Sequence, residues 1–237
     1  MNYLEVPGLF NHFSETDGID SLSYCNDKTH WKNYPKKIAY EYNSKGFRDA
    51  EWPNDTSNLI WCLGDSFTSG VGQPQNETWP ALLQAKLNQR CINLGQDGCS
   101  NDLIALRAKQ IIEQHDPKYL IIVWSYFWRR YVSGQNIHYE EKETPADDIK
   151  NFIKNLMAVN NLFDNVINFT VPRAMIKPNV LWPIYNKKFD IKKTIEKITK
   201  KTLPQFSEID QKDYARDGHH FDIKTSNALV EKILTSL

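Results

Sequence analysis

The chain has 237 residues, of which 41% are hydrophobic, and its 29 lysine and arginine residues balance 29 aspartate and glutamate residues. This length and apolar content are enough for one large core, so we expect a single globular unit. A net charge of zero gives no overall field that would attract nucleic acid or an anionic membrane, so we expect neither as a partner.

The opening residues lack the basic and apolar regions of a secretion signal. The longest apolar run, Tyr119–Trp124, is far shorter than the roughly 20 residues that span a bilayer. We therefore expect a soluble, cytoplasmic protein. The cysteines have no CxxC spacing and no neighbouring histidine, which disfavours a zinc site, and we expect reduced thiols, no metal and no cofactor. They are Cys25, Cys62, Cys91 and Cys99.

Residues 1–57 carry the weakest pattern. Ile38, Tyr40 and Tyr42 alternate with their neighbours as in a half-buried strand, and residues 43–46 have the composition of a turn. We interpret residues 1–57 as an N-terminal extension that wraps the core, and residues 58–237 as the main domain.

From residue 58 onward, short apolar runs alternate with helical patterns, which is typical of a parallel sheet covered by helices on both faces. We predict an α/β fold with three layers, α/β/α, around a five-stranded parallel sheet. A polar segment at 133–146 favours a surface loop. The predicted strands are 59–63, 91–94, 119–124, 166–171 and 180–182, and the predicted helices are 79–87, 100–115, 147–160, 191–198 and 225–237.

Ser66 directly follows the first predicted strand, and ligands of open parallel sheets bind beyond the carboxyl ends of the strands. A serine hydroxyl is a weak nucleophile unless a base removes its proton, and His220 is the candidate base. Asp217, three residues earlier, is within reach of the other ring nitrogen, where a carboxylate orients and stabilises the imidazole. These side chains favour acyl-transfer chemistry.

Alternative interpretations of these residues remain open. The order Ser, Asp, His occurs in α/β-hydrolases, but the G-x-S-x-G elbow is absent because Thr68 stands where its last glycine would be. His219, His220 and Asp222 could instead bind a metal, although three ligands in one tight loop rarely close a site. We expect Asp65 to support the loop by hydrogen bonds.

The blocks Gly64-Asp65-Ser66-Phe67-Thr68-Ser69-Gly70, Asn93-Leu94-Gly95-Gln96-Asp97-Gly98 and Asp217-Gly218-His219-His220 together resemble those of the SGNH hydrolase family, also called GDSL esterases. The resemblance covers residues 58–237. It implies a flavodoxin-like sandwich, a catalytic triad of Ser66, His220 and Asp217, and an oxyanion hole formed by the amides of Ser66 and Gly98.

The third block departs from the family pattern. After the third strand the family has Gly-x-Asn-Asp, whereas this chain has Trp124-Ser125-Tyr126-Phe127-Trp128-Arg129-Arg130. One oxyanion donor is therefore missing, and Ser125, Asn101 or Arg129 are its candidate replacements. Trp124, Phe127 and Arg129 are candidate substrate-binding residues, since rings stack on sugar or acyl groups and Arg129 or Arg130 suits a carboxylate or phosphate. Packing against helices is the alternative for the rings.

The sequence therefore predicts a serine esterase that forms an acyl-Ser66 intermediate on a small-molecule or carbohydrate ester, with carbohydrate O-deacetylation as one form of the reaction. An O-acyltransferase would use the same triad with an acceptor hydroxyl in place of water. A binding module whose hydrolase chemistry has decayed is the rival from another class, because the third-block asparagine is absent.

Overall fold

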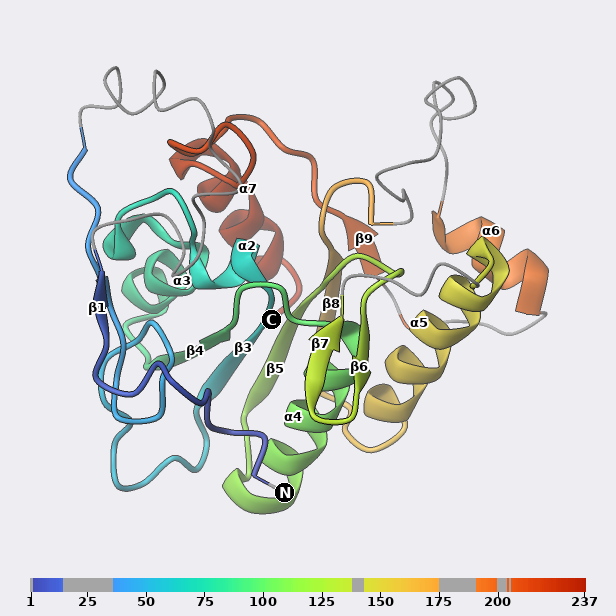
Figure 1. Cartoon of the computed structure of the whole chain (residues 1–237), viewed down its shortest axis with the longest axis horizontal. Coiled ribbons are helices and arrows are strands. Elements are labelled where there is room, and N and C mark those ends of the chain that lie inside the picture. Colours follow the sequence, from blue (N-terminus) through green and yellow to red (C-terminus); the bar gives the residue numbers. More distant parts are fainter. Residues whose placement is uncertain (1, 15–35, 138–142, 175–190, 200–203, 205) are drawn as a thin grey trace.

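The computed structural model describes residues 2–14, 36–137, 143–174, 191–199, 204 and 206–237. Its centre is a five-stranded parallel sheet with the strand order β4-β3-β5-β8-β9 (Figure 1). Numbered along the chain, this order is 2-1-3-4-5, the flavodoxin-like arrangement. The strands are β3 (Ile60–Gly64), β4 (Cys91–Gly95), β5 (Tyr119–Trp124), β8 (Val166–Thr170) and β9 (Phe206–Glu208).

The strands β4, β3 and β5, which lie side by side in the sheet, are buried. Every residue of β3 and β4 is buried, as is all of β5 after its first residue. Strands covered on both faces read as continuous apolar runs, which is why the sequence predicts these strands well. The predictions for β3, β4, β5 and β8 are confirmed to within one residue at each end.

Helices cover both faces of the sheet, so the predicted three-layer α/β/α architecture is confirmed. Helix α3 (Trp79–Leu87) packs with α7 (Ile223–Leu234) on one face, and α4 (Asn101–His115) packs with α5 (Pro145–Asn160) on the other (Figure 1). Helix α6 (Ile191–Thr199) contacts β9. All five predicted helices are present.

Local capping sets where the helices begin and end. The Ser100 hydroxyl accepts a hydrogen bond from the Leu103 amide at the start of α4, and Asp116 ends this helix in the left-handed conformation. Thr144 and Asp147 form a reciprocal capping box at the start of α5. Both ends of α4 and the start of α5 therefore follow from the local sequence.

Two expectations about the second half need correction. The fifth strand of the sheet is β9, which pairs in parallel with β8, whereas the predicted strand 180–182 lies outside the described residues. The predicted loop at 133–146 begins inside an antiparallel hairpin of β6 (Arg130–Val132) and β7 (Gln135–Ile137) and ends inside α5. Short polar strands carry too little periodicity to register in a sequence pattern.

Described parts of the N-terminal segment lie against the main sheet. Strand β2 (Tyr40–Glu41) pairs with β1 (Phe13–Ser14), and the Tyr3 amide donates to Gln110 of α4 at 2.8 Å. The segment also contributes apolar side chains to the main core, namely Leu4, Val6 and Phe47. The division of the chain at residue 57 stays a prediction.

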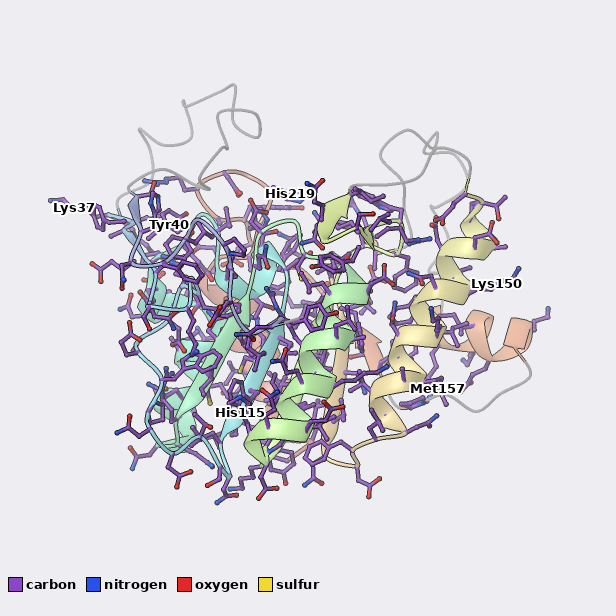
Figure 2. All side chains as sticks on the ribbon, turned by 60° about the horizontal axis from the view of Figure 1, so that its bottom comes forward. Lys37, Tyr40, His115, Lys150, Met157 and His219 are labelled. Carbon is purple, nitrogen blue, oxygen red and sulfur yellow. The ribbon has the colours of Figure 1, made fainter. Side chains whose placement is uncertain are left out.

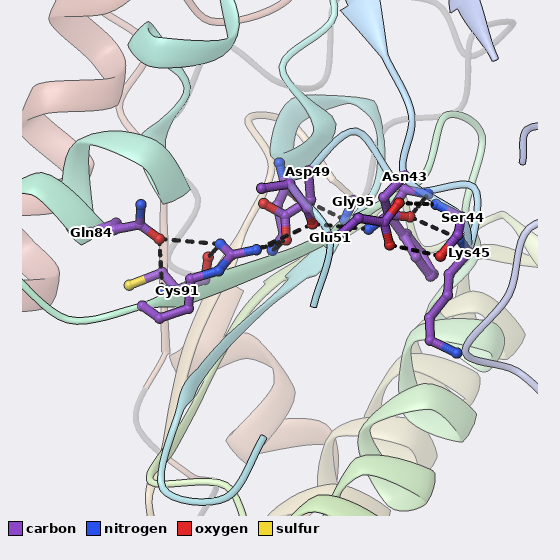
Figure 3. Close-up of polar contacts among 12 residues, drawn as sticks. Asn43, Ser44, Lys45, Asp49, Glu51, Gln84, Cys91 and Gly95 are labelled. Atoms are coloured by element: carbon purple, nitrogen blue, oxygen red, sulfur yellow. Dashed lines mark hydrogen bonds and ion pairs between the residues drawn. The ribbon is translucent and has the colours of Figure 1, made fainter. Parts of the chain in front are cut away.

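A polar network fastens the same segment to the edge strand β4. The Asp49 carboxylate accepts hydrogen bonds from the Arg90 guanidinium at 2.7 Å and the Asn93 amide at 3.1 Å (Figure 3). Arg90 also donates to Gln84 of α3 at 3.1 Å, and Glu51 accepts from the Ser44 hydroxyl at 2.7 Å. The segment is thus held near the strand that precedes the Gly98 loop.

No helix within the described ranges is long and apolar enough to cross a membrane.

Cys62, Cys91 and Cys99 are free thiols, and all three are buried, as expected for cysteines in and beside buried strands.

Candidate active site

The chain turns sharply where β3 ends, and a single helical turn, α2 (Ser66–Ser69), starts there. Asp65 is its N-cap, and its carboxylate accepts a hydrogen bond from the Phe67 amide at 3.1 Å. Gly70 ends the turn with a φ of 77°, a left-handed conformation that glycine adopts without strain. Ser66 therefore sits at a helix N-terminus, at the carboxyl end of a buried strand.

Close backbone packing holds this turn against the neighbouring strand. A Cβ atom at Gly95, the last residue of β4, would lie 2.1 Å from the Ser69 amide nitrogen and 2.6 Å from the Thr68 carbonyl carbon. Such distances are impossible for real atoms, so only glycine lets α2 approach β4 this closely. The second sequence block thereby contributes to the position of Ser66.

Three side chains from two distant parts of the chain form a continuous series of hydrogen bonds. The Ser66 hydroxyl oxygen lies 2.7 Å from Nε2 of His220, and Nδ1 of His220 is hydrogen-bonded to a carboxylate oxygen of Asp217. The other carboxylate oxygen of Asp217 accepts the amides of His219 and His220 at 2.9 and 3.0 Å. All three partners are buried, with exposures of 2% for Ser66, 5% for His220 and 9% for Asp217.

The charges of Asp217 and His220 favour a role for His220 as a proton acceptor. Burial opposes the charge of Asp217, but the imidazole of His220 and the two amides outweigh it and lower the pKa of Asp217 to about 2. Burial likewise opposes the charge of His220, yet the charge and hydrogen bond of Asp217 raise the pKa of His220 above its ordinary value. Asp217 is thus an anion at neutral pH and stabilises a proton on His220.

His219 lies beside this group. Figure 2 shows it at the opposite end of the molecule from His115, the last residue of α4. Its Nε2 lies 3.4 Å from the Tyr126 hydroxyl, and burial, followed by the charge of His220, lowers its pKa. Because both ring nitrogens of the adjacent His220 are already hydrogen-bonded to Ser66 and Asp217, the metal interpretation of this loop gains no support.

The amides expected to form an oxyanion hole have open hydrogen-bonding capacity. Within the described ranges, neither the Ser66 nor the Gly98 amide donates a hydrogen bond. Gly98 has a φ of 68°, and a Cβ atom there would meet no atom within 4 Å. The space beside Gly98 is therefore open.

The residues proposed to replace the missing asparagine form one buried network. The Ser125 hydroxyl donates to Asp65 at 2.6 Å, and Nη1 of Arg129 donates to both Asp65 and Ser125, at 2.8 and 2.9 Å. The Asn101 amide group donates to the backbone carbonyls of Ser125 and Tyr126 and accepts the Ser125 amide. Ser125 and Asn101 thus have their donors engaged, and Asp65 supports the loop as expected.

Two of the candidate substrate-binding residues lie in the core. Trp124 is 0% and Phe127 is 1% exposed, and both rings pack on Phe152 of α5, Phe127 with a centroid separation of 3.9 Å. The Trp124 indole nitrogen donates to Asn168 at 3.0 Å. The packing interpretation explains both rings, so they are corrected to core residues. Arg129, in contrast, lies beside Asp65.

Sequence reasoning missed how the N-terminal segment contacts the loop after α2. Arg48 is 1% exposed and donates to the backbone carbonyls of Ala39, Ser69, Gly70 and Gln73. These bonds attach Arg48 to the backbone of the loop that follows α2.

Tyr40 supports the same loop. Its hydroxyl accepts the Gly72 amide at 2.8 Å, and the Gly72 carbonyl accepts the amide of Arg216, the neighbour of Asp217. The alternation of Ile38, Tyr40 and Tyr42 predicts that Tyr40 faces the core, but it does not predict these contacts.

Comparisons with protein-family models and with curated proteins give no match. Among solved structures, TesA is 15% identical over 76% of this chain and 98% of that chain, with a TM-score of 0.48. A family two carbohydrate esterase from Clostridium thermocellum, in complex with cellohexaose, is 12% identical over 79% of this chain and 65% of that chain, with a TM-score of 0.49. The esterase EstA from Pseudoalteromonas sp. is 19% identical over 76% of this chain and 96% of that chain, with a TM-score of 0.47.

Among these three structures the identity is at most 19% and the TM-score at most 0.49. Similarity at this level does not assign a reaction. What this chain does must be inferred from its own fold and its own site.

Proposed function

We propose that the chain is a serine esterase of the SGNH type, with Ser66 as the nucleophile, His220 as the base and Asp217 as its orienting carboxylate. The observation that carries this proposal is the unbroken hydrogen-bonded series from Ser66 Oγ through both nitrogens of His220 to the Asp217 carboxylate. Its substrate is an ester of a small molecule or a carbohydrate, including O-acetyl esters.

In the first half of the reaction, Ser66 Oγ attacks the ester carbonyl carbon while its proton passes to Nε2 of His220. The negative charge that develops on the carbonyl oxygen is stabilised by the amides of Ser66 and Gly98, neither of which donates a hydrogen bond within the described ranges. His220 then gives its proton to the leaving alcohol oxygen, and the acyl group stays on Ser66.

In the second half, His220 takes a proton from water, and the resulting hydroxide attacks the acyl-Ser66 carbonyl carbon. Collapse of this intermediate returns the proton to Ser66 Oγ and releases the carboxylic acid. Asp217 remains ionised throughout, in keeping with its pKa of about 2, and stabilises the imidazolium in both halves.

The test is hydrolysis of para-nitrophenyl acetate by wild type and Ser66→Ala. We expect the variant to lose activity, by about a thousandfold or more, with an unchanged thermal melt, because only the nucleophilic oxygen is removed. Ser69→Ala is the matched control, since Ser69 is a buried serine of the same turn whose hydroxyl bonds the Ser66 carbonyl. Equal activity of wild type and Ser66→Ala would refute the proposal.

Product analysis identifies the acceptor. An esterase releases the free acid, whereas an O-acyltransferase would produce a new ester when an acceptor alcohol is added. Hydrolysis that is insensitive to added alcohols supports the esterase.

A further inference from the structure

Arg129 is a buried cation attached to the nucleophile turn. Its side chain is 6% exposed, and its partner Asp65 is 0% exposed and directly precedes Ser66. Nη1 of Arg129 donates to Asp65 at 2.8 Å and to the Ser125 hydroxyl at 2.9 Å. The guanidinium is therefore bonded to the residue that directly precedes Ser66 in the chain.

The other edge of this guanidinium makes no hydrogen bond to the described residues. Nε of Arg129 is buried without a hydrogen-bond partner among the described residues. Nη2 donates no hydrogen bond in that same part of the chain, since Nη1 makes every hydrogen bond of this group. The N–H bonds of Nε and Nη2 are nearly parallel in a planar guanidinium, so together they form a fork of two donors.

Buried donors that lack an acceptor are unfavourable for folding. A buried donor without an acceptor destabilises the fold, and the destabilisation is larger when the donor belongs to a charged group. The acceptor that matches two parallel donors is a planar group with two oxygens, because an arginine and a carboxylate form paired charge-assisted hydrogen bonds. This edge is therefore shaped for a carboxylate.

The surroundings place the Arg129 guanidinium near the loop of the proposed base. The Arg129 guanidinium carbon lies 5.0 Å from the Tyr126 ring centroid and 5.5 Å from that of Trp128, and the Tyr126 hydroxyl reaches His219. Arg129 is thus connected through Tyr126 to the loop that carries His219 and His220.

We propose that the Nε and Nη2 edge of Arg129 binds a carboxylate carried by the substrate, which makes acidic esters the preferred substrate class. The inference rests on the proposed esterase function and deepens it. The stacked rings of Tyr126 and Trp128 cover the guanidinium, and the carboxylate displaces one of them to reach Nε. Binding at this edge fixes the ester relative to Ser66.

The test compares acidic esters with matched neutral ones. Mono-para-nitrophenyl glutarate, with a carboxylate in the acyl part, is paired with para-nitrophenyl butyrate. The para-acetoxybenzoate anion, with a carboxylate in the alcohol part, is paired with phenyl acetate. For wild type we expect kcat/KM for one acidic ester to exceed that of its partner by about tenfold to a hundredfold, the range for a paired charge-assisted hydrogen bond.

Arg129→Lys retains a cation for Asp65 but cannot form the fork. We expect it to abolish most of the acidic preference, mainly through a higher KM for the acidic ester. Arg130→Lys is the matched control, because Arg130 is 7% exposed and donates to the Phe127 and Arg129 carbonyls and to Asp148. Its acidic preference should equal that of wild type.

The outcomes separate this inference from the esterase proposal. Ser66-dependent hydrolysis of neutral esters without any acidic preference, or a preference that survives Arg129→Lys, overturns the role of Arg129 and leaves the esterase in place. A loss of kcat in Arg129→Lys that is equal for acidic and neutral esters also overturns it, because the guanidinium would then act on the reacting oxygen. The absence of Ser66-dependent turnover of every ester overturns both.

Discussion

Replacing Asp217 with asparagine removes one negative charge from the buried series and keeps its shape. The amide oxygen of asparagine can still accept the His219 and His220 amides, but its NH2 group cannot accept the proton on Nδ1 of His220. The imidazole then loses both its orientation and its compensating charge. An equivalent change in a well-studied serine protease lowers kcat by about ten-thousandfold, and we expect a loss of that order.

The same substitution has a predictable effect on stability. The pKa of Asp217 falls from 3.8 to about 2, and a unit of pKa corresponds to about 1.4 kcal/mol, so the ionised carboxylate stabilises the fold by about 2 kcal/mol. This contribution is present above pH 3.8 and is lost as the pH falls through the folded value. The raised pKa of His220 adds stability that is present below its ordinary value of 6.5 and is lost as the pH rises through its folded value.

The stability difference between wild type and Asp217→Asn should therefore be largest near pH 5 and smaller at both pH 3 and pH 9. Urea unfolding of the two proteins at these values measures it, and para-nitrophenyl acetate hydrolysis at pH 8 measures the loss of rate. A variant that is as stable as wild type at pH 5 and hydrolyses the ester within tenfold of it would refute this account of Asp217.

Three further predictions follow from single features of the structure. Because the pKa of His220 is raised, the acidic limb of kcat/KM should have its midpoint above 6.5, and a midpoint below that value would contradict the pairing with Asp217. Gly95→Ala should lower kcat/KM and destabilise the fold by about 1–3 kcal/mol, since its Cβ would collide with the α2 backbone; wild-type activity and an unchanged melt would show that α2 can shift freely. In a Cys25→Ser variant, the thiols of Cys62, Cys91 and Cys99 should resist iodoacetamide at pH 8 in the folded protein and react with it in urea. The reason is that all three are buried, and burial raises the pKa of Cys99 to about 11. Rapid alkylation of the folded protein would contradict this packing.

The sequence predicts the layers of the fold because buried strands and helices have different patterns of apolar residues. Strands β3 and β5 are buried on both faces and appear as apolar runs, while α4 carries a cap at Ser100 and an apolar stripe. Strand β9 has three residues, of which only Phe206 is buried, so its pattern resembles a loop. Its place at the sheet edge depends on pairing with β8, which local sequence does not encode.

The same distinction applies to the site. Ser66 and the loop around His220 are recognisable as short motifs, and parallel topology predicts which end of the sheet they share. The network around Arg129 joins residues that are 64 positions apart, and its partners are chosen by tertiary packing. Trp124 is the last residue of β5 and Phe127 lies just after it, near the same region, but the direction of each side chain decides that both enter the core.

Fluorophosphonate labelling tests the central claim most directly, because the probe reacts only with a serine that a neighbouring base activates. Intact-mass and peptide analysis of wild type should show one adduct, located on Ser66, and Ser66→Ala should show none. Loss of the adduct in His220→Gln would link that reactivity to the imidazole that lies 2.7 Å from Ser66. Wild-type protein that stays unlabelled while folded would contradict a serine hydrolase and favour a binding module instead.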